Sequence, residues 1–65
     1  MYALEWFVGR YHVGTPDAEV RAEVRARLRP DVDAATRRAI VAQAVRIHRR
    51  NRRLYADVMS GRVGR

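Results

Sequence analysis

The sequence has no cysteine, no lysine and no long apolar run, and each absence narrows what the chain can be. Without cysteine, no disulfide or cysteine-ligated zinc can brace a core of only 65 residues. A core of this size is only marginally stable by itself. We therefore expect the chain to form one domain, residues 1–65, that assembles into a homo-oligomer. Residues 39–45, the longest uncharged stretch of the basic half, cannot span a bilayer, and residues 1–6 lack the pattern of a secretion signal. We expect a protein of the cytoplasm without a membrane partner.

Groups that carry out chemistry are scarce as well. No glycine-rich phosphate loop and no nucleophile motif is present. His12 and His48 lie far apart in the sequence without further ligands nearby, which argues against a metal site. Asp31 and Asp33 are typical of a helix start rather than of a catalytic carboxylate pair. We therefore expect no enzymatic activity, no cofactor, no metal and no small-molecule substrate.

Charge is distributed unevenly along the chain. Residues 1–33 hold five arginines and six acidic residues, a net charge of −1, whereas residues 34–65 hold nine arginines and one acidic residue, a net charge of +8. This split indicates an anionic partner, either nucleic acid or an acidic protein. The absence of lysine does not add to that evidence, because GC-rich codon usage alone favours arginine.

Two proline–aspartate pairs divide the chain into predicted helices. Thr15 is a natural N-cap before Pro16, and Val20, Val24 and Leu28 form an apolar stripe, which predicts a helix over residues 16–28. We expect Asp17 to pair with Arg21 four residues later.

The second predicted helix covers residues 33–60 and is long for so short a chain. Asp31 or Asp33 caps its start, and Gly61 stands where a left-handed C-terminal cap belongs. The helix is amphipathic. Its apolar positions recur at helical spacing and form a candidate packing or oligomer seam, which comprises Ile40, Ala44, Ile47, Asn51, Leu54 and Val58. His48 lies at the edge of this apolar face, where we expect a partly hydrated side chain. Asn51 in that seam is typical of a residue that fixes register.

The first segment, residues 1–14, contains most of the aromatic side chains. Leu4, Phe7, Val8 and Tyr11 share one helical face, although residues 2–8 also alternate like a short strand. We favour a helix, and we expect the aromatic side chains, Trp6 included, to supply core. The predicted fold is thus all-α, a short helical hairpin packed on one long basic amphipathic C-terminal helix, followed by a basic tail at residues 61–65.

The candidate residues for an anionic partner are arginines of the long helix: Arg38, Arg46, Arg49, Arg50, Arg52 and Arg53. Phosphate contact and a merely solvated face are equally compatible with this cluster, since only Asp57 lies four residues after one of its members.

The run Val13–Val20, together with His48–Tyr55 and Val58–Arg62, resembles small uncharacterised accessory proteins of phages that infect high-GC actinobacteria. The resemblance implies a phage protein in a bacterial host and implies no activity. A weaker likeness is to ribbon-helix-helix DNA-binding proteins, with residues 2–8 as the strand, although Leu4, Trp6 and Val8 depart from the polar side chains with which that strand reads DNA.

Two functions follow as hypotheses. The first is a non-enzymatic helical interaction module that self-associates and binds a host or phage protein. The alternative is a small regulator that binds nucleic acid through the arginine-rich helix. A peripheral membrane helix ranks last, because the apolar face of the long helix carries no tryptophan or phenylalanine.

Overall fold

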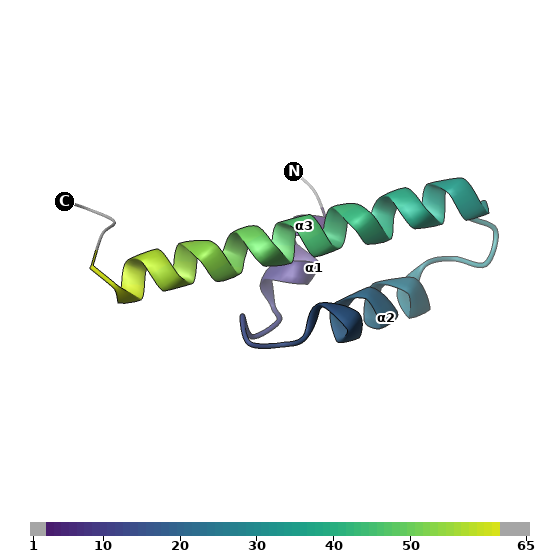
Figure 1. The fold of residues 1–65 in the computed structure, drawn as a ribbon. Coiled ribbons are helices and arrows are strands. Elements are labelled where there is room, and N and C mark those ends of the chain that lie inside the picture. The colour runs from purple at the N-terminus through teal and green to yellow at the C-terminus, as the bar shows by residue number, and fades with distance from the viewer. Residues whose placement is uncertain (1–2, 62–65) are drawn as a thin grey trace.

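The computed structural model describes residues 3–61, which form three helices joined by two loops (Figure 1). Helix α1 spans Ala3–Gly9, α2 spans Asp17–Arg27 and α3 spans Ala34–Met59. The two shorter helices pack against the long one, which confirms the predicted all-α architecture. The strand alternative for residues 2–8 is wrong, because residues 3–9 are helical. Arg62 and Arg65 of the predicted basic tail lie outside the described residues.

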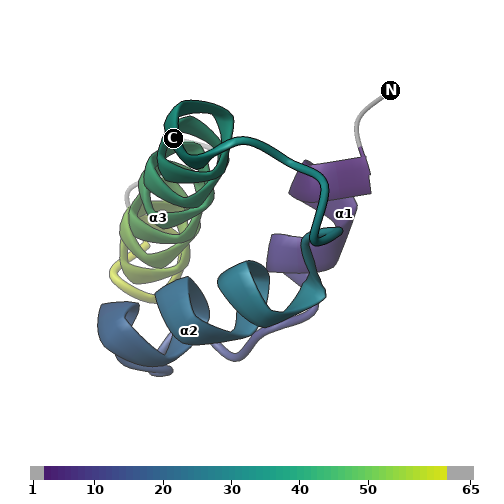
Figure 2. The same cartoon turned by 90° about the vertical axis from the view of Figure 1, so that its right-hand side faces the viewer.

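The core is a small cluster of aliphatic side chains drawn from all three helices. Its fully or almost fully buried members are Val8 from α1, Val20 and Val24 from α2, and Val41, Ala44 and Ile47 from α3. Figure 2 shows the three helices arranged around this centre. The contributions of α2 come from the predicted four-residue spacing, which places Val20 above Val24 on one face.

The start of α2 differs from the prediction. The N-cap residue is Pro16 in an extended conformation, and no side chain caps the helix. Thr15 therefore lies one position too early to act as the cap. Its carbonyl oxygen instead accepts hydrogen bonds from the side chains of His48 and Arg52 on α3. The helix start is held by tertiary contacts rather than by a local cap.

Both ends of α3 follow the local signals. Asp33 is the N-cap, and its carboxylate accepts a hydrogen bond from the backbone nitrogen of Thr36 at 3.3 Å and another from the Thr36 hydroxyl at 2.6 Å. These bonds hold the pKa of Asp33 below its usual value. At the other end Gly61 has a φ of 79°, the left-handed conformation expected of a C-terminal cap.

Helix α3 is much longer than its neighbours and extends past them. Its 26 residues correspond to a length of about 39 Å at 1.5 Å per residue. Figure 1 shows α1 and α2 beside the first part of α3, while the C-terminal part projects beyond them. We call this projecting part, residues 53–59, the overhang.

The aromatic side chains contribute less to the core than expected. Phe7 and Tyr11 are half-buried and pack edge to face against each other, with ring centroids 5.4 Å apart. Trp6 is 65% exposed, with the guanidinium of Arg10 4.9 Å from its ring centre. The expectation that Trp6 belongs to the core is therefore wrong, and Tyr2 lies outside the described residues.

Candidate functional site

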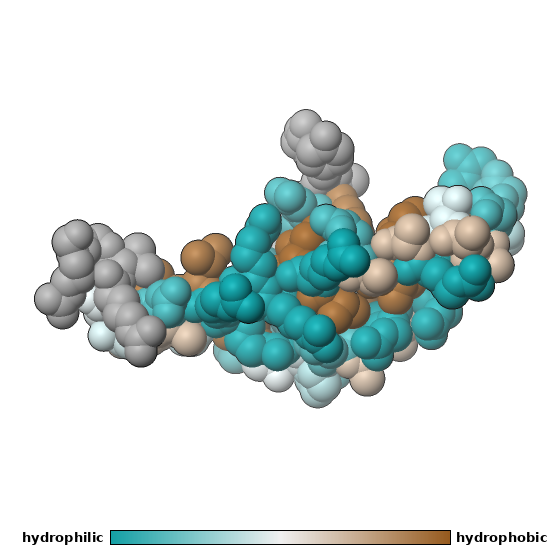
Figure 3. Space-filling model, turned by 45° about the horizontal axis from the view of Figure 1, so that its top comes forward, coloured by the Kyte–Doolittle hydropathy of each residue, from teal (hydrophilic) through white to brown (hydrophobic). Residues whose placement is uncertain are grey.

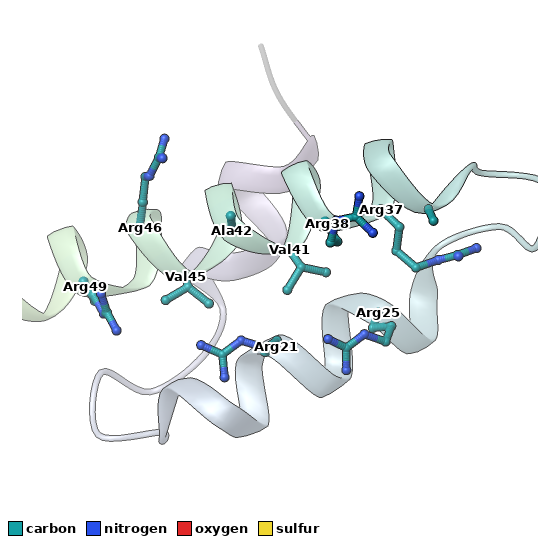
Figure 4. A pocket seen from close by; sticks show the side chains of 10 residues that line it. Arg21, Arg25, Arg37, Arg38, Val41, Ala42, Val45, Arg46 and Arg49 are labelled. Carbon is teal, nitrogen blue, oxygen red and sulfur yellow. The ribbon is translucent and has the colours of Figure 1, made fainter.

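A groove of about 600 Å³ lies between α2 and α3, and arginine side chains surround it (Figure 4). Two of these arginines come from α2 and four from α3: Arg21, Arg25, Arg37, Arg38, Arg46 and Arg49. Among the described residues, no acidic side chain lines the groove. We call it the arginine groove. Six guanidinium groups, of which only that of Arg49 is paired with a carboxylate within residues 3–61, make a positive surface concentrated in one concavity.

The floor of the arginine groove is apolar. Val41 and Val45 point from α3 toward α2 (Figure 4), and Ala42 also lines the groove. Arg21 and Arg25 project from α2, and Arg46 extends from α3 away from α2 and forms part of the rim (Figure 4). The groove therefore combines a hydrophobic base with positively charged walls.

Three of the six arginines have no partner within residues 3–61. The side chains of Arg21, Arg25 and Arg38 make neither an ion pair nor a hydrogen bond there. The remaining three are engaged: Arg37 donates to the carbonyl oxygen of Arg29, Arg46 to the side chain of Gln43, and Arg49 to Asp17. The unpartnered guanidiniums of Arg21, Arg25 and Arg38 retain all of their donors for an anionic ligand.

The sequence of α2 explains why the arginine groove lacks acidic residues. Arg21 and Arg25 directly follow the buried Val20 and Val24, so they lie along one edge of the buried stripe. Glu23, near the opposite edge, lines a separate pocket with Tyr11 and Arg27. Arg21 and Arg25 thus line the arginine groove, while Glu23 lies outside it.

The structure divides the six arginines that the sequence singles out. Arg38, Arg46 and Arg49 line the arginine groove, whereas Arg50, Arg52 and Arg53 do not. Three groove residues were missed by sequence reasoning: Arg21, Arg25 and Arg37. Arg21 and Arg25 could have been found from the sequence, because each directly follows a valine of the apolar stripe and therefore lies at the border with a neighbouring helix.

Asp17, the first residue of α2, joins that helix to the basic helix α3. Its carboxylate accepts hydrogen bonds from Nε of Arg49 and from Nη2 of Arg52, each at 2.8 Å, instead of pairing with Arg21 as predicted. These bonds, that from Arg49 first, hold the pKa of Asp17 below its ordinary value. Nε of Arg52 also donates to the carbonyl oxygen of Val13 at 3.1 Å. Two of the predicted binding arginines therefore have a structural role.

His48 is also structural. Its side chain is completely buried rather than partly hydrated at the edge of the apolar face, which corrects the prediction. The ring nitrogen Nε2 lies 2.8 Å from the carbonyl oxygen of Thr15. Among residues 3–61, no group of three or more histidine, cysteine, aspartate or glutamate side chains is arranged to hold a metal ion.

The predicted seam of α3 separates into two parts. Ala44 and Ile47 are buried in the core, and Ile40 is half-buried against it. Leu54 and Val58, on the overhang, are 51% and 58% exposed, and Asn51 at the boundary is half-buried. The N-terminal part of the seam thus packs within the chain, while its C-terminal part has no partner within residues 3–61.

No protein-family model, curated protein or solved structure matches this chain. No helix in the described part of the chain has the length and apolarity needed to cross a membrane.

Proposed function

We propose that this chain is a non-enzymatic binding module whose arginine groove takes up an acidic, partly apolar segment of a partner protein. The observation that supports this most is the pairing of three unpartnered arginines, Arg21, Arg25 and Arg38, with an apolar floor. Carboxylates of the partner accept hydrogen bonds from the guanidiniums, and its apolar side chains cover Val41 and Ala42.

The dimensions of the groove suit this type of ligand. Its volume of about 600 Å³ lies within the range of roughly 300–1,000 Å³ that is common for binding sites. An amphipathic helix places acidic and apolar side chains on adjoining faces, which matches charged walls beside an apolar floor. A partner segment with acidic residues on both sides of an apolar stripe would pair with both walls at once.

Nucleic acid is the second candidate, because basic side chains continue beyond the groove. Arg50 and Arg53 on α3 are exposed and make no ion pair within the described residues. Together with Arg46 they repeat at four- and three-residue spacing, which forms a charged stripe along one side of the helix. A phosphate backbone needs such a stripe but gains nothing from a valine floor.

Fluorescence anisotropy with two kinds of labelled probe separates these candidates. One probe is a peptide with glutamate and leucine at helical spacing, compared with a peptide in which serine replaces leucine. The other probe is duplex DNA. Each is titrated across a salt series against the wild type and two variants of equal charge, Arg21→Ala/Arg38→Ala in the groove and Arg50→Ala/Arg53→Ala outside it.

We expect the glutamate–leucine peptide to bind at physiological salt and more tightly than the serine peptide. The groove variant should weaken that binding by about a hundredfold or more, since it removes two arginines and each lost charged hydrogen bond costs about 1.5–3 kcal/mol. The variant outside the groove should have a much smaller effect. Equal losses in the two variants, or tight binding of DNA alone, would refute the proposal and favour the nucleic-acid candidate.

A further inference from the structure

The arginine groove ends beside a carboxylate that belongs to the chain itself. Asp17, Arg21 and Arg25 follow one another at four-residue spacing on α2, which places them along one side of that helix. Arg21 and Arg25 line the groove, and Asp17 lies one turn before them. Its carboxylate oxygen Oδ2 accepts a hydrogen bond from Nε of Arg49, a groove arginine on α3, at 2.8 Å. Asp17 thus forms with Arg49 the type of bond that we propose for a carboxylate of the partner.

The pair of Asp17 and Arg49 is accessible to a dissolved anion on the arginine side. The side chain of Arg49 is 61% exposed, whereas that of Asp17 is 21% exposed. Figure 3 shows hydrophilic surface, in teal, across the middle of the molecule, beside hydrophobic surface, in brown. Nε is the one donor of Arg49 that has a partner within residues 3–61, so both Nη groups are available to an anion while Nε still contacts Asp17.

Asp17 has a second partner, which remains when Arg49 leaves. Its other carboxylate oxygen, Oδ1, accepts a hydrogen bond from Nη2 of Arg52, also at 2.8 Å. Arg52 does not line the groove, and its Nε donates to the carbonyl oxygen of Val13. If Arg49 turns to another anion, Asp17 therefore keeps one charged hydrogen bond and avoids the penalty of an unpaired carboxylate.

We propose that Asp17 is an intramolecular competitor for the arginine groove. In the free chain it neutralises Arg49. When an anionic ligand enters the groove, Arg49 leaves Asp17 for the ligand, and Asp17 stays with Arg52. This inference rests on the proposed function of the groove and adds a control on its affinity.

The competition also determines which ligands bind. A ligand has to take Arg49 from a carboxylate that is tethered beside it, so every ligand loses part of the affinity that a free Arg49 would give. A ligand with a single acidic group gains little from that exchange. Asp17 thus favours acidic segments whose further carboxylates reach the unpartnered arginines of the groove.

Fluorescence anisotropy with the glutamate–leucine peptide tests the competition in the full chain. Asp17→Asn removes the competing charge and frees Arg49, so it should bind the peptide about threefold to tenfold more tightly than the wild type. Asp31→Asn removes the same charge from a carboxylate outside the groove and should change the affinity much less. Asp17→Glu retains a carboxylate and should remain closer to the wild type than Asp17→Asn does.

A double-mutant cycle identifies Arg49 as the group that is released. In an Arg49→Gln background, Asp17→Asn should give much less than its gain in the wild-type background, because no groove arginine is then freed. A gain of the same size in both backgrounds would trace the effect to overall charge and overturn the proposal. Weaker or unchanged binding by an Asp17→Asn chain that circular dichroism shows to be folded would overturn it as well.

NMR spectroscopy of the wild type follows the exchange without any substitution, with inorganic sulfate as the probe. As sulfate is added, the Nε–H signal of Arg49 should shift. The Nε–H signal of Arg52 should stay in place, because that nitrogen donates to Val13. An Arg49 signal that does not respond, or equal shifts of both signals, would contradict the exchange even if Asp17→Asn does not fold.

The two probes separate this inference from the proposed function. Equal peptide affinity of the wild type and Asp17→Asn overturns the competition and leaves the groove as a peptide site. A peptide that binds neither chain, together with a sulfate-induced shift of the Arg49 signal, refutes the proposed function and supports the competition for anions. If neither probe has an effect, both proposals are wrong.

Discussion

The ring nitrogen Nε2 of His48 lies 2.8 Å from the carbonyl oxygen of Thr15, which comes 33 positions earlier in the chain. A carbonyl oxygen only accepts hydrogen bonds, so Nε2 carries a hydrogen and donates it. The other ring nitrogen, Nδ1, is buried without a hydrogen-bond partner in the described part of the chain. One bond from a fully buried side chain thus fixes the loop before α2 to the middle of α3.

We predict that His48→Ala destabilises the fold severely. The substitution removes a completely buried side chain and the hydrogen bond to Thr15, which together should cost about 2–4 kcal/mol. A domain of this size has only about 3–5 kcal/mol of stability, so the variant should retain only about 1 kcal/mol near room temperature. His48→Gln retains a side-chain donor and should lose less. Urea titrations followed by circular dichroism measure both losses, and equal stability of the alanine variant and the wild type would contradict this role.

A second prediction concerns acid sensitivity through Asp17. Hydrogen bonds from Arg49 and Arg52 lower its pKa in the folded chain, so the carboxylate stabilises the fold above its ordinary pKa of 3.8. That contribution is lost as the pH falls through the lower pKa of the folded state. We expect Asp17→Asn to be less stable than the wild type at neutral pH, and the two chains to approach equal stability in strong acid.

The measurement is the unfolding free energy as a function of pH for both chains. Asp31→Asn is the control, because within residues 3–61 that exposed carboxylate pairs only with the nearby Arg29. Asp33 contributes an acid-sensitive component of its own through its bonds to Thr36, so the Asp17 variant should keep part of the pH dependence. A constant stability difference between the wild type and Asp17→Asn from neutral pH to strong acid would contradict the assignment.

Local signals predicted the helices well, because their causes lie within a few residues. Asp33 caps α3 and Gly61 closes it, as the sequence indicates. The start of α2 could not be predicted in the same way, because the group that holds Thr15 comes from α3. Likewise, the neighbours of Asp17 in sequence suggested a pair with Arg21, but its actual partners, Arg49 and Arg52, are brought to it only by the tertiary fold.

The seam of α3 shows the same limit and leads to a third prediction. Periodicity places Ile47 and Leu54 on one face without revealing where the covering helices end. We expect Ile47→Ala, in the core, to cost about 2–4 kcal/mol. Leu54→Ala should cost little in dilute protein, because its side chain is 51% exposed. Thermal unfolding at low concentration compares the two, and similar losses in both variants would show that the overhang is covered within a single chain.

The arginine groove could be predicted only in part, because it is formed by two helices. Arg38, Arg46 and Arg49 belong to the basic helix, which composition alone identifies. Arg21 and Arg25 lie in the acidic half of the chain, where the net charge conceals them. Only the packing of α2 on α3 brings these cations together, so the concentration of charge in one concavity is a property of the fold.

That concentration of charge predicts a conflict between stability and binding. Arg38→Glu places a carboxylate among guanidiniums that repel one another, so we expect the unbound chain to be more stable by roughly 0.5 kcal/mol at low salt. The substitution should change interactions within α3 very little, because the residues three and four positions from Arg38 are alanine and valine. Arg38→Gln, which removes one cation without adding an anion, should give a smaller gain.

Thermal unfolding at low and high salt checks this prediction together with anisotropy of the glutamate–leucine peptide. The gain in stability should shrink as salt screens the groove, and the same variant should bind the peptide more weakly than the wild type. A destabilised Arg38→Glu chain would mean that Arg38 contributes to the fold. If Arg38→Glu stabilises the chain and leaves peptide binding unchanged, the charge of the groove is not needed for binding. If it stabilises the chain and weakens peptide binding, the arginines of the groove are retained for a partner.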